Sequence, residues 1–366
     1  MAKIRVLTVV GARPQFVKAA VVSRAMRAQS QMEELILHTG QHYDHDMSDV
    51  FFDELAIPHP AYNLGVGSGS HGAQTGAMLA KIEEVILSEK PDWVLIYGDT
   101  NSTLAAALAA SKLHAPVAHV EAGLRSFNKR MPEEQNRIVA DHLSSLLLTP
   151  TVAADNNLSR EGIDAGKILR VGDVMYDATL YAGQREQSGP SILEKLDLQT
   201  NRYILSTIHR AENTDVPSRM EAVLAGLAEA AESHTVLLPL HPRTKKLISE
   251  NAQLTQFASK LKIVAPVGYF EMAVLEANAA LIVTDSGGVQ KEAYFHQKPC
   301  VTLRDETEWN ELVDLGWNRI QPPTSREAVA SAITAALGTT GDMGPTPYGD
   351  GHAGEQIVET LTTFCP

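Results

Sequence analysis

The sequence predicts an α/β fold with two domains, each containing a parallel β-sheet. Short apolar runs of strand length recur in both halves of the chain, with helical segments between them. Polar residues and glycine follow several of these runs, as expected where a buried strand emerges into a loop. The length of 366 residues also exceeds what one ordinary hydrophobic core supports, so two domains are expected.

Composition and charge restrict the classes of partner. The formal net charge of -13 argues against nucleic acid or an anionic membrane surface as a partner. An anionic substrate would need a local basic cluster, because salt screens distant charges over about 8 Å. The only cysteines, Cys300 and Cys365, have no paired spacing, so neither a disulfide framework nor a thiolate zinc site is supported. No apolar run reaches membrane-spanning length and the N-terminal run reads as a strand, so we expect a cytoplasmic protein.

The alternation of apolar runs and helices divides the chain into two halves. Strands are expected at residues 3–10, 35–38, 92–97, 116–120 and 145–150, and then at 203–207, 235–240, 261–267, 281–284 and 298–303. The expected domains are residues 1–172 and 202–352, with a polar connection at 173–201. A C-terminal helix at 353–366 is expected to join the first domain.

Acidic residues follow two of the expected strands in the first half. The run at 92–97 ends in Gly98-Asp99, and Glu121 comes directly after the run at 116–120, while Glu133 lies at a helix start marked by Pro132. The carboxyl ends of parallel strands face one crevice, so Asp99 and Glu121 should both point there. Crowded carboxylates provide an acid beside a base. The alternative for each single residue is a helix cap or an ion pair with a nearby arginine.

Basic residues follow other strands. Arg13 and Lys18 lie at the junction between the first strand and its helix, where backbone N–H groups and cations can hold phosphate. The alternative is that both are surface residues of an ordinary helix. In the second half, basic residues again stand at strand ends, namely His209, Arg210, His241 and Arg304.

The most specific local pattern is Thr284-Asp285-Ser286-Gly287-Gly288, between a buried strand and a helix. Glycines at a helix start allow backbone amides to approach a diphosphate closely. Glu292 follows about two turns into that helix and can accept hydrogen bonds from ribose hydroxyls. The alternative is a glycine turn with an exposed glutamate.

Two polar loops do not fit metal or dinucleotide sites. The loop at residues 40–46 is rich in His and Asp, but its spacing matches no standard zinc site. The glycine loop at 65–72 lacks the strand and the spacing of a dinucleotide fingerprint. Neither a metal nor a nicotinamide cofactor is therefore expected.

Taken together, the motifs resemble those of the non-hydrolysing UDP-N-acetylglucosamine 2-epimerases over nearly the whole chain. The resemblance implies two Rossmann-like domains of the glycosyltransferase B type, with the active site in the interdomain cleft, no metal or redox cofactor, and a homodimer. The motifs are Gly11-Ala-Arg13-Pro14, Gly98-Asp99-Thr100, His119-Val-Glu121-Ala-Gly-Leu-Arg125, Pro132-Glu133-Glu134-Gln-Asn136-Arg137, His209-Arg210 and Thr284-Asp-Ser286-Gly-Gly-Val-Gln290.

The resemblance also implies a mechanism. UDP leaves by anti elimination across C1 and C2 of the sugar, and it adds back after a proton has returned to the opposite face of C2. By motif, the catalytic set is Asp99, Glu121, Glu133, His209 and Lys18. The expected UDP-sugar contacts are Arg13, Arg210, His241, Ser286, Gly287, Gly288, Glu292 and Arg304.

Two departures from the commoner family pattern concern the sugar. Arg13-Pro14-Gln15 stands where the family usually has Arg-Pro-Glu. Thr307-Glu308-Trp309-Asn310-Glu311 stands where it usually has Thr-Glu-Arg-Pro-Glu, so that Trp309-Asn310 replaces Arg-Pro. Both variants are similar to a branch that acts on UDP-2,3-diacetamido-2,3-dideoxyglucuronate for surface polysaccharide synthesis, and Trp309 could pack against the C3 acetamido group. Some relatives are activated by substrate at a second site, which the loop around Gln41 and His42 resembles.

Three rival functions remain open. A retaining UDP-sugar glycosyltransferase would share the fold but would release UDP, because fold alone does not determine function. A hydrolysing 2-epimerase would release UDP and a free sugar. A catalytically silent UDP-sugar sensor would lack the acids at 99, 121 and 133, all of which are present.

Overall fold

The structure, a computed structural model, describes residues 3–41, 52, 55, 57–184, 190–240, 242–344 and 346–364. The side chains of residues 13, 242 and 243 lie outside that description. The chain forms two compact units, unit 1 with Met1–Ala178 and Thr346–Pro366, and unit 2 with Thr179–Pro345. The boundary falls within helix α7 (Val174–Gln184), in a region that the sequence suggested was a polar connection.

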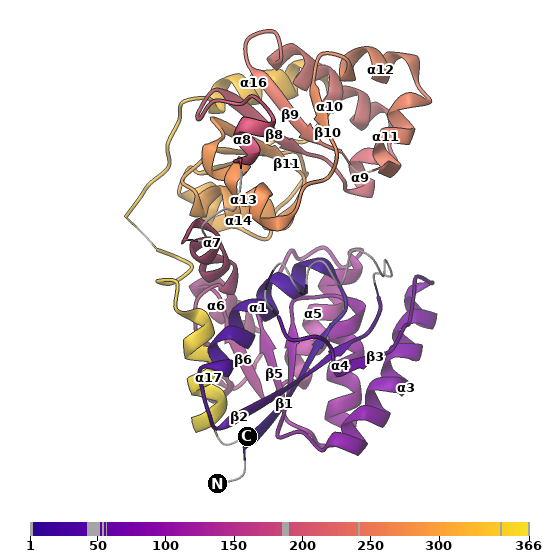
Figure 1. Cartoon of the computed structure of the whole chain (residues 1–366), viewed down its shortest axis with the longest axis vertical. Coiled ribbons are helices and arrows are strands. Elements are labelled where there is room, and N and C mark those ends of the chain that lie inside the picture. The colour runs from indigo at the N-terminus through magenta and orange to yellow at the C-terminus, as the bar shows by residue number, and fades with distance from the viewer. Residues whose placement is uncertain are drawn as a thin grey trace. The chain divides into compact units, whose positions relative to one another are not determined.

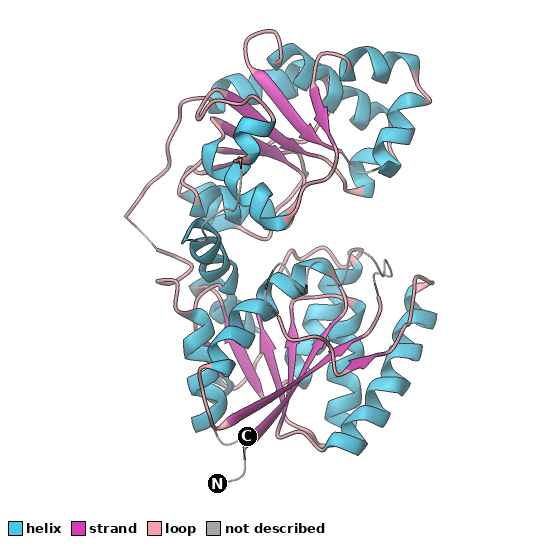
Figure 2. Cartoon of the chain, in the orientation of Figure 1, coloured by secondary structure: helices cyan, strands magenta, loops and turns pink. Residues whose placement is uncertain are grey.

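Unit 1 contains a seven-stranded sheet in the order β3-β2-β1-β4-β5-β6-β7, with parallel pairing throughout (Figure 1). Its central strands β4, β5 and β6 are mostly apolar and buried along their whole length, because helices cover both faces of the sheet (Figure 2). The strands are β1 (Ile4–Val10), β2 (Met32–His38), β3 (Tyr62–Asn63), β4 (Trp93–Tyr97), β5 (Val117–Val120), β6 (Leu146–Thr149) and β7 (Ile168–Arg170).

The helices of unit 1 connect successive strands. Helices α3 (His71–Glu89), α4 (Asn101–Lys112) and α5 (Pro132–Leu143) pack in a row, and α1 (Arg13–Arg27) packs against α17 (Ala353–Thr363). The indole nitrogen of Trp93 donates a hydrogen bond to the carbonyl of Leu361 at 3.2 Å, which ties α17 to the start of β4. Helix α6 (Val152–Arg160) and a short 3-10 turn (Ala165–Lys167) complete the unit.

Unit 2 contains a six-stranded parallel sheet in the order β10-β9-β8-β11-β12-β13. Its strands are β8 (Tyr203–Thr207), β9 (Thr235–Pro239), β10 (Lys262–Val264), β11 (Leu281–Thr284), β12 (Cys300–Thr302) and β13 (Asn318–Ile320). Its helices are α8 (Ile192–Lys195), α9 (Ala211–Thr214), α10 (Pro217–Ala230), α11 (Pro242–Ser249), α12 (Ala252–Ala258), α13 (Tyr269–Asn278), α14 (Gly287–Phe295), α15 (Asn310–Asp314) and α16 (Arg326–Ala336).

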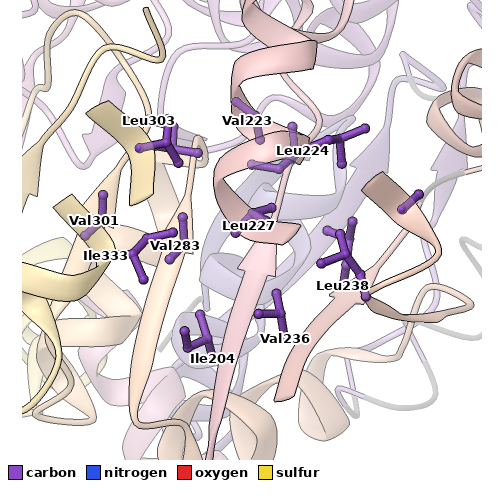
Figure 3. Close-up of a cluster of buried hydrophobic side chains, with 14 of the residues drawn as sticks. Ile204, Val223, Leu224, Leu227, Val236, Leu238, Val283, Val301, Leu303 and Ile333 are labelled. Atoms are coloured by element: carbon purple, nitrogen blue, oxygen red, sulfur yellow. The ribbon is translucent and has the colours of Figure 1, made fainter. Parts of the chain in front are cut away.

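One hydrophobic core cluster of unit 2 lies between a face of this sheet and helices α10, α11, α12 and α16 (Figure 3). Leu224 and Leu227 of α10 contribute fully buried side chains, as does Val283 of β11. Burial of such side chains contributes about 1.5 to 3 kcal/mol each relative to exposure. The core therefore fixes the strands whose carboxyl ends carry the polar residues of unit 2.

The structure confirms the predicted α/β class with two parallel sheets, which is of the glycosyltransferase B type. The expected long apolar strands all occur, with ends that differ by a few residues. The short edge strands β3, β7 and β13 were missed, since two or three residues carry no readable periodicity.

Candidate active site

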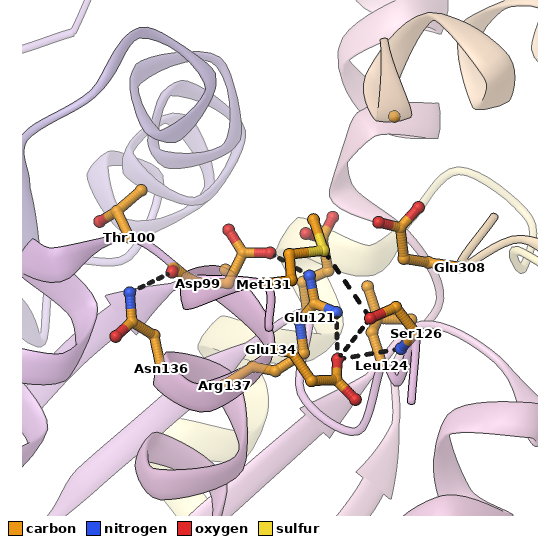
Figure 4. A network of polar contacts seen from close by, with 12 residues as sticks. Asp99, Thr100, Glu121, Leu124, Ser126, Met131, Glu134, Asn136, Arg137 and Glu308 are labelled. Carbon is orange, nitrogen blue, oxygen red and sulfur yellow. Dashed lines mark hydrogen bonds and ion pairs between the residues drawn. The ribbon is translucent and has the colours of Figure 1, made fainter. Parts of the chain in front are cut away.

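Asp99 lies on a tight turn at the carboxyl end of β4. Gly98 has a φ of 60°, a conformation that glycine adopts without steric cost, and it redirects the chain after Tyr97. The Asp99 carboxylate accepts a hydrogen bond from Arg137 of α5 at 2.5 Å. The side-chain amide of Asn136 donates to the Asp99 carbonyl at 2.9 Å, and Thr100 caps α4 by accepting from the Thr103 N–H. Asp99 is therefore held through both its backbone and its side chain (Figure 4).

Glu121 directly follows β5 and has a backbone conformation that is rare for a residue with a side chain. Its φ is 67°, which costs of the order of 1 kcal/mol and persists only where the surroundings enforce it. Its carboxylate forms an ion pair with the Lys18 ammonium at 2.5 Å, and the two side chains are only 8% and 11% exposed. A Cβ placed on Gly98 would lie 3.3 Å from Lys18 Nζ and 3.6 Å from Glu121 Oε1. The pair therefore lies against the turn that carries Asp99.

The two adjacent glutamates at the start of α5 have different surroundings. Glu134 is 1% exposed and accepts hydrogen bonds from the backbone N–H groups of Ser126 and Phe127, each at 2.9 Å. Arg137 donates to it at 2.7 Å and so lies between Glu134 and Asp99 (Figure 4). In the part of the chain that the structure describes, the half-buried Glu133 carboxylate has no hydrogen-bond or ion-pair partner. Glu133 is therefore the acid left available for a ligand.

Gln15 organises the turn that precedes α1. Its side-chain oxygen accepts from the N–H groups of Gly11 and Ala12 at 2.8 and 3.1 Å. Its side-chain nitrogen donates to the Tyr97 carbonyl at 2.8 Å and to the Thr103 hydroxyl. An ionised carboxylate cannot donate these last two bonds, so Gln15 is explained by its own buried surroundings. The side chain of Arg13, on the same turn, lies outside the described residues, as do His241 and His42.

In unit 2, His209 is oriented by Asp285. The Nδ1 atom of His209 lies 3.2 Å from the Asp285 carboxylate, which also accepts the N–H groups of His209 and Arg210. Burial opposes ionisation of the fully buried Asp285, yet the hydrogen bonds and charge of His209 outweigh it and lower the pKa of Asp285. The His209 side chain is 55% exposed, so a ligand can reach the ring. Asp285 follows a strand directly, which is the signal that identified Asp99 and could have identified it too.

There is open space beside both glycines at the start of α14. Ser286 caps the helix by accepting from the Val289 N–H. A Cβ placed on Gly287 or Gly288 would meet nothing closer than 3.8 Å, the nearest atom being Nη2 of Arg210. Glu292 follows on the same helix and is 9% exposed. The structure thus brings Arg210 next to the glycine turn, as an anion site at a helix N-terminus requires.

Trp309 contacts this glycine turn. Its ring is 4% exposed, and its indole N–H donates to the Gly287 carbonyl at 3.0 Å. The ammonium of the buried Lys291 lies 4.1 Å from the ring centroid, within the range of a cation–π interaction. These contacts account for the tryptophan without any contact to a sugar.

Arg304 is 2% exposed and forms a two-point ion pair with Glu308, with N–O distances of 2.9 and 3.1 Å. Burial opposes this charge, but Glu308 outweighs it and the pKa of Arg304 is raised. The Arg304 guanidinium, which the sequence suggested as a UDP contact, is therefore paired with Glu308 within unit 2.

The described residues offer neither a metal site nor a membrane span. Among them, no group of three or more His, Cys, Asp or Glu side chains is arranged to hold a metal ion. None of the described helices has the length and apolar character needed to cross a membrane.

Comparisons with known proteins identify the family. The family model for UDP-N-acetylglucosamine 2-epimerase matches residues 24–362. The chain belongs to this family. A UDP-N-acetylglucosamine 2-epimerase homolog of Methanococcus maripaludis is 51% identical, with 98% of this chain and 99% of the homolog covered. The UDP-2,3-diacetamido-2,3-dideoxy-D-glucuronate 2-epimerase of Pseudomonas aeruginosa is 49% identical over the same shares of the two chains.

A solved structure agrees with the family. The UDP-GlcNAc 2-epimerase of Methanocaldococcus jannaschii, in complex with UDP-GlcNAc and UDP, has a TM-score of 0.88 at 44% identity. It covers 98% of this chain and 99% of its own. The UDP-sugar 2-epimerase described here is accordingly an isomerase.

Proposed function

We propose that this 2-epimerase inverts C2 of a UDP-2-acetamido sugar by eliminating UDP and adding it back. A base removes the C2 proton while the bond between C1 and the phosphate oxygen breaks, which leaves a 2-acetamidoglucal and UDP. A proton then returns to the opposite face of C2, and UDP attacks C1 again. The net change is an isomerisation without gain or loss of atoms.

The observation that carries this proposal is the pairing of two strand-end acids with two cations in unit 1. Glu121 pairs with Lys18 and Asp99 with Arg137, in each case at 2.5 Å. Elimination and re-addition need a base on one face of C2, an acid on the other, and cations for the leaving diphosphate. We propose that Asp99, Glu121, Glu133, Lys18 and His209 together form the catalytic set.

Unit 2 would hold the nucleotide. The open N-terminus of α14 at Ser286, Gly287 and Gly288 suits a diphosphate, and Arg210 lies beside it. Glu292 would accept hydrogen bonds from the ribose hydroxyls. His209, oriented by Asp285, would contact the diphosphate or the departing oxygen. Arg13 and His241 are proposed as further contacts to the UDP-sugar.

The acids are tested by two conservative variants. Asp99→Asn and Glu121→Gln should each abolish turnover while UDP affinity, which depends on unit 2, stays within about tenfold, or roughly 1.4 kcal/mol. Isothermal titration with UDP measures the affinity and a coupled assay the turnover. Loss of UDP binding in either variant would mean that these acids are structural.

A second candidate substrate is UDP-2,3-diacetamido-2,3-dideoxyglucuronate. It is favoured by Trp309-Asn310 in place of the commoner Arg-Pro and by the Pseudomonas aeruginosa relative. The structure accounts for Gln15 and Trp309 by internal contacts, so these two residues do not by themselves choose the sugar. We also propose a cytoplasmic homodimer that supplies surface polysaccharide synthesis; light scattering after size exclusion would test the dimer.

Proton NMR in heavy water tests both the reaction and the sugar. The enzyme is incubated separately with UDP-N-acetylglucosamine and with the diacetamido-glucuronate nucleotide. Deuterium at C2 together with the UDP-manno epimer is the expected result for the true substrate. Free UDP without a manno nucleotide would instead indicate hydrolase or transferase chemistry.

A further inference from the structure

A buried ionic network lies behind the turn that carries Asp99. His119 is in β5, two residues before Glu121, and its side chain is 0% exposed. Its Nδ1 atom lies 2.7 Å from Asp141 Oδ1 of α5. Its Nε2 atom lies 2.7 Å from the carbonyl oxygen of Gly98, the residue before Asp99. The imidazole therefore connects α5 to the end of β4 through the interior of unit 1.

Both ring nitrogens of His119 face acceptors. A backbone carbonyl has no proton to give, so Nε2 must donate to Gly98. Asp141 is held as a carboxylate because its Oδ2 atom accepts from Arg125 at 2.7 Å and from the Gly123 N–H at 3.1 Å. Burial opposes this ionisation, but the bonds and charges of His119 and Arg125 outweigh it and lower the pKa of Asp141. Because an ionised Asp141 can only accept a hydrogen bond, the Nδ1 atom of His119 must donate as well.

The acids of the network share their charge among several partners. Arg125 forms ion pairs with two acids, Asp141 and Glu161, each at 2.7 Å. Glu161 is 27% exposed and also lies 3.3 Å from His142 Nε2, so solvent and a second partner share its charge. The doubly protonated state of His119 therefore depends on its two acceptors, the Asp141 carboxylate and the Gly98 carbonyl.

The Gly98 carbonyl, which His119 contacts, belongs to the turn that carries Asp99. The Gly98 N–H donates to the Val120 carbonyl at 3.0 Å, and the Asp99 carbonyl accepts from Asn136 at 2.9 Å. The peptide that joins Gly98 to Asp99 lies between these two anchors, and glycine is the residue type with the greatest backbone freedom. The bond from His119 restrains the peptide that sets the direction of the Asp99 side chain.

We propose that His119, protonated on both ring nitrogens and held by Asp141, is a positioning residue that fixes the Gly98 carbonyl and thereby the Asp99 carboxylate. The inference rests on the proposed catalytic role of Asp99. Misplacement of a catalytic group by about 1 Å can reduce the rate about 100-fold.

Two matched substitutions separate the two hydrogen bonds. In His119→Gln the amide nitrogen occupies the place of Nε2 and can donate to Gly98, while the bond to Asp141 is lost. In His119→Asn the amide occupies the place of Nδ1, so Asp141 keeps its partner and Gly98 loses its own. Each variant removes one buried hydrogen bond, and we expect similar decreases in the thermal midpoint. The exposed His114, whose φ of 57° asparagine tolerates, provides His114→Asn as a control with unchanged turnover.

We expect kcat to fall about 100-fold in His119→Asn, with KM and UDP affinity changed by less than about threefold, and to fall about tenfold or less in His119→Gln. Equal losses of kcat in the two variants, or no loss in His119→Asn, would overturn the proposal. Asp99→Asn is measured alongside. If Asp99→Asn retains wild-type turnover, the proposed role of Asp99 fails; if it is inactive while His119→Asn is fully active, only the positioning role fails.

Nitrogen NMR provides a readout that a merely structural role would not change. The full-length protein is labelled with 15N-histidine, and the spectrum of His119→Gln assigns the signals of His119. We expect a bound proton on both ring nitrogens. A bare Nδ1 would place the proton on Asp141 and would overturn the proposal.

Discussion

Asp177 makes the stability of unit 1 depend on pH in a direction opposite to that of most carboxylates. Its Oδ2 atom accepts the Gly354 N–H at the start of α17 at 2.9 Å, while its buried Oδ1 atom has no hydrogen-bond partner among the described residues. Burial raises the pKa of Asp177 from its ordinary value of 3.8 to about 6; the nearby Asp173 adds to this, and the backbone bonds from α17 oppose it. The folded state therefore binds this proton more tightly than the unfolded state.

The sign and the size follow from linkage. Between the unfolded and folded pKa values the folded protein holds a proton that the unfolded chain has lost, so stability falls as pH rises from about 4 to about 6. A shift of about two units corresponds to about 3 kcal/mol, as an upper figure. Asp177→Asn keeps an oxygen that can accept the Gly354 N–H and removes the buried charge. We expect this variant to match the wild type near pH 4 and to be more stable by up to about 3 kcal/mol above pH 7.

The assay is urea unfolding at pH 4.5 and pH 7.5, followed by hydrogen exchange of peptides from β4 and α17, which report unit 1 alone. Asp164→Asn serves as the control, because Asp164 is exposed in the same unit and asparagine can keep its turn. The reasoning is refuted if Asp177→Asn and the wild type lose the same amount of stability between these two pH values.

Three further predictions concern single contacts. Lys18→Met and Glu121→Gln should each cost about 3 kcal/mol, because each removes one partner of a buried ion pair, and the double variant should cost clearly less than the sum; additivity within about 0.5 kcal/mol in a double-mutant cycle would rule out the coupling. Asp285→Asn should reduce turnover about tenfold to 100-fold with little change in KM, because His209 loses its orienting carboxylate; unchanged pH–rate profiles and rates would contradict this. Gly123→Ala should destabilise unit 1 by more than 2 kcal/mol, because the new Cβ would lie 2.7 Å from a backbone oxygen of α6 at a φ of 83°; an unchanged melting temperature would show that α6 can move.

Several site residues could be found from the sequence because their signal is local. Glu121 directly follows an apolar run, Asp99 and Ser286 follow one after a single intervening residue, and a buried parallel strand ends where polar residues begin. Asp285 carries the same signal. His119 also carries one, because it is a polar residue inside an otherwise apolar run.

The roles of neighbouring residues could not be separated in this way. Glu133 and Glu134 are adjacent in the same helix start, yet only Glu134 turns inward to the loop at Ser126. Arg304 follows a strand as the other candidate cations do, but the structure engages it with Glu308. Their difference depends on which way each side chain packs, and a sequence pattern does not contain that information.

The sequence by itself determined the α/β class, the long strands and the acids that follow the strand ends, because apolar periodicity and chain direction are local properties. The tertiary structure alone decided the partners of those acids. Lys18 reaches Glu121 across 103 positions of sequence and Arg137 reaches Asp99 across 38. Such pairs form only after distant strands take their places in the sheet, since side chains so far apart in the chain meet through packing and not through local preference.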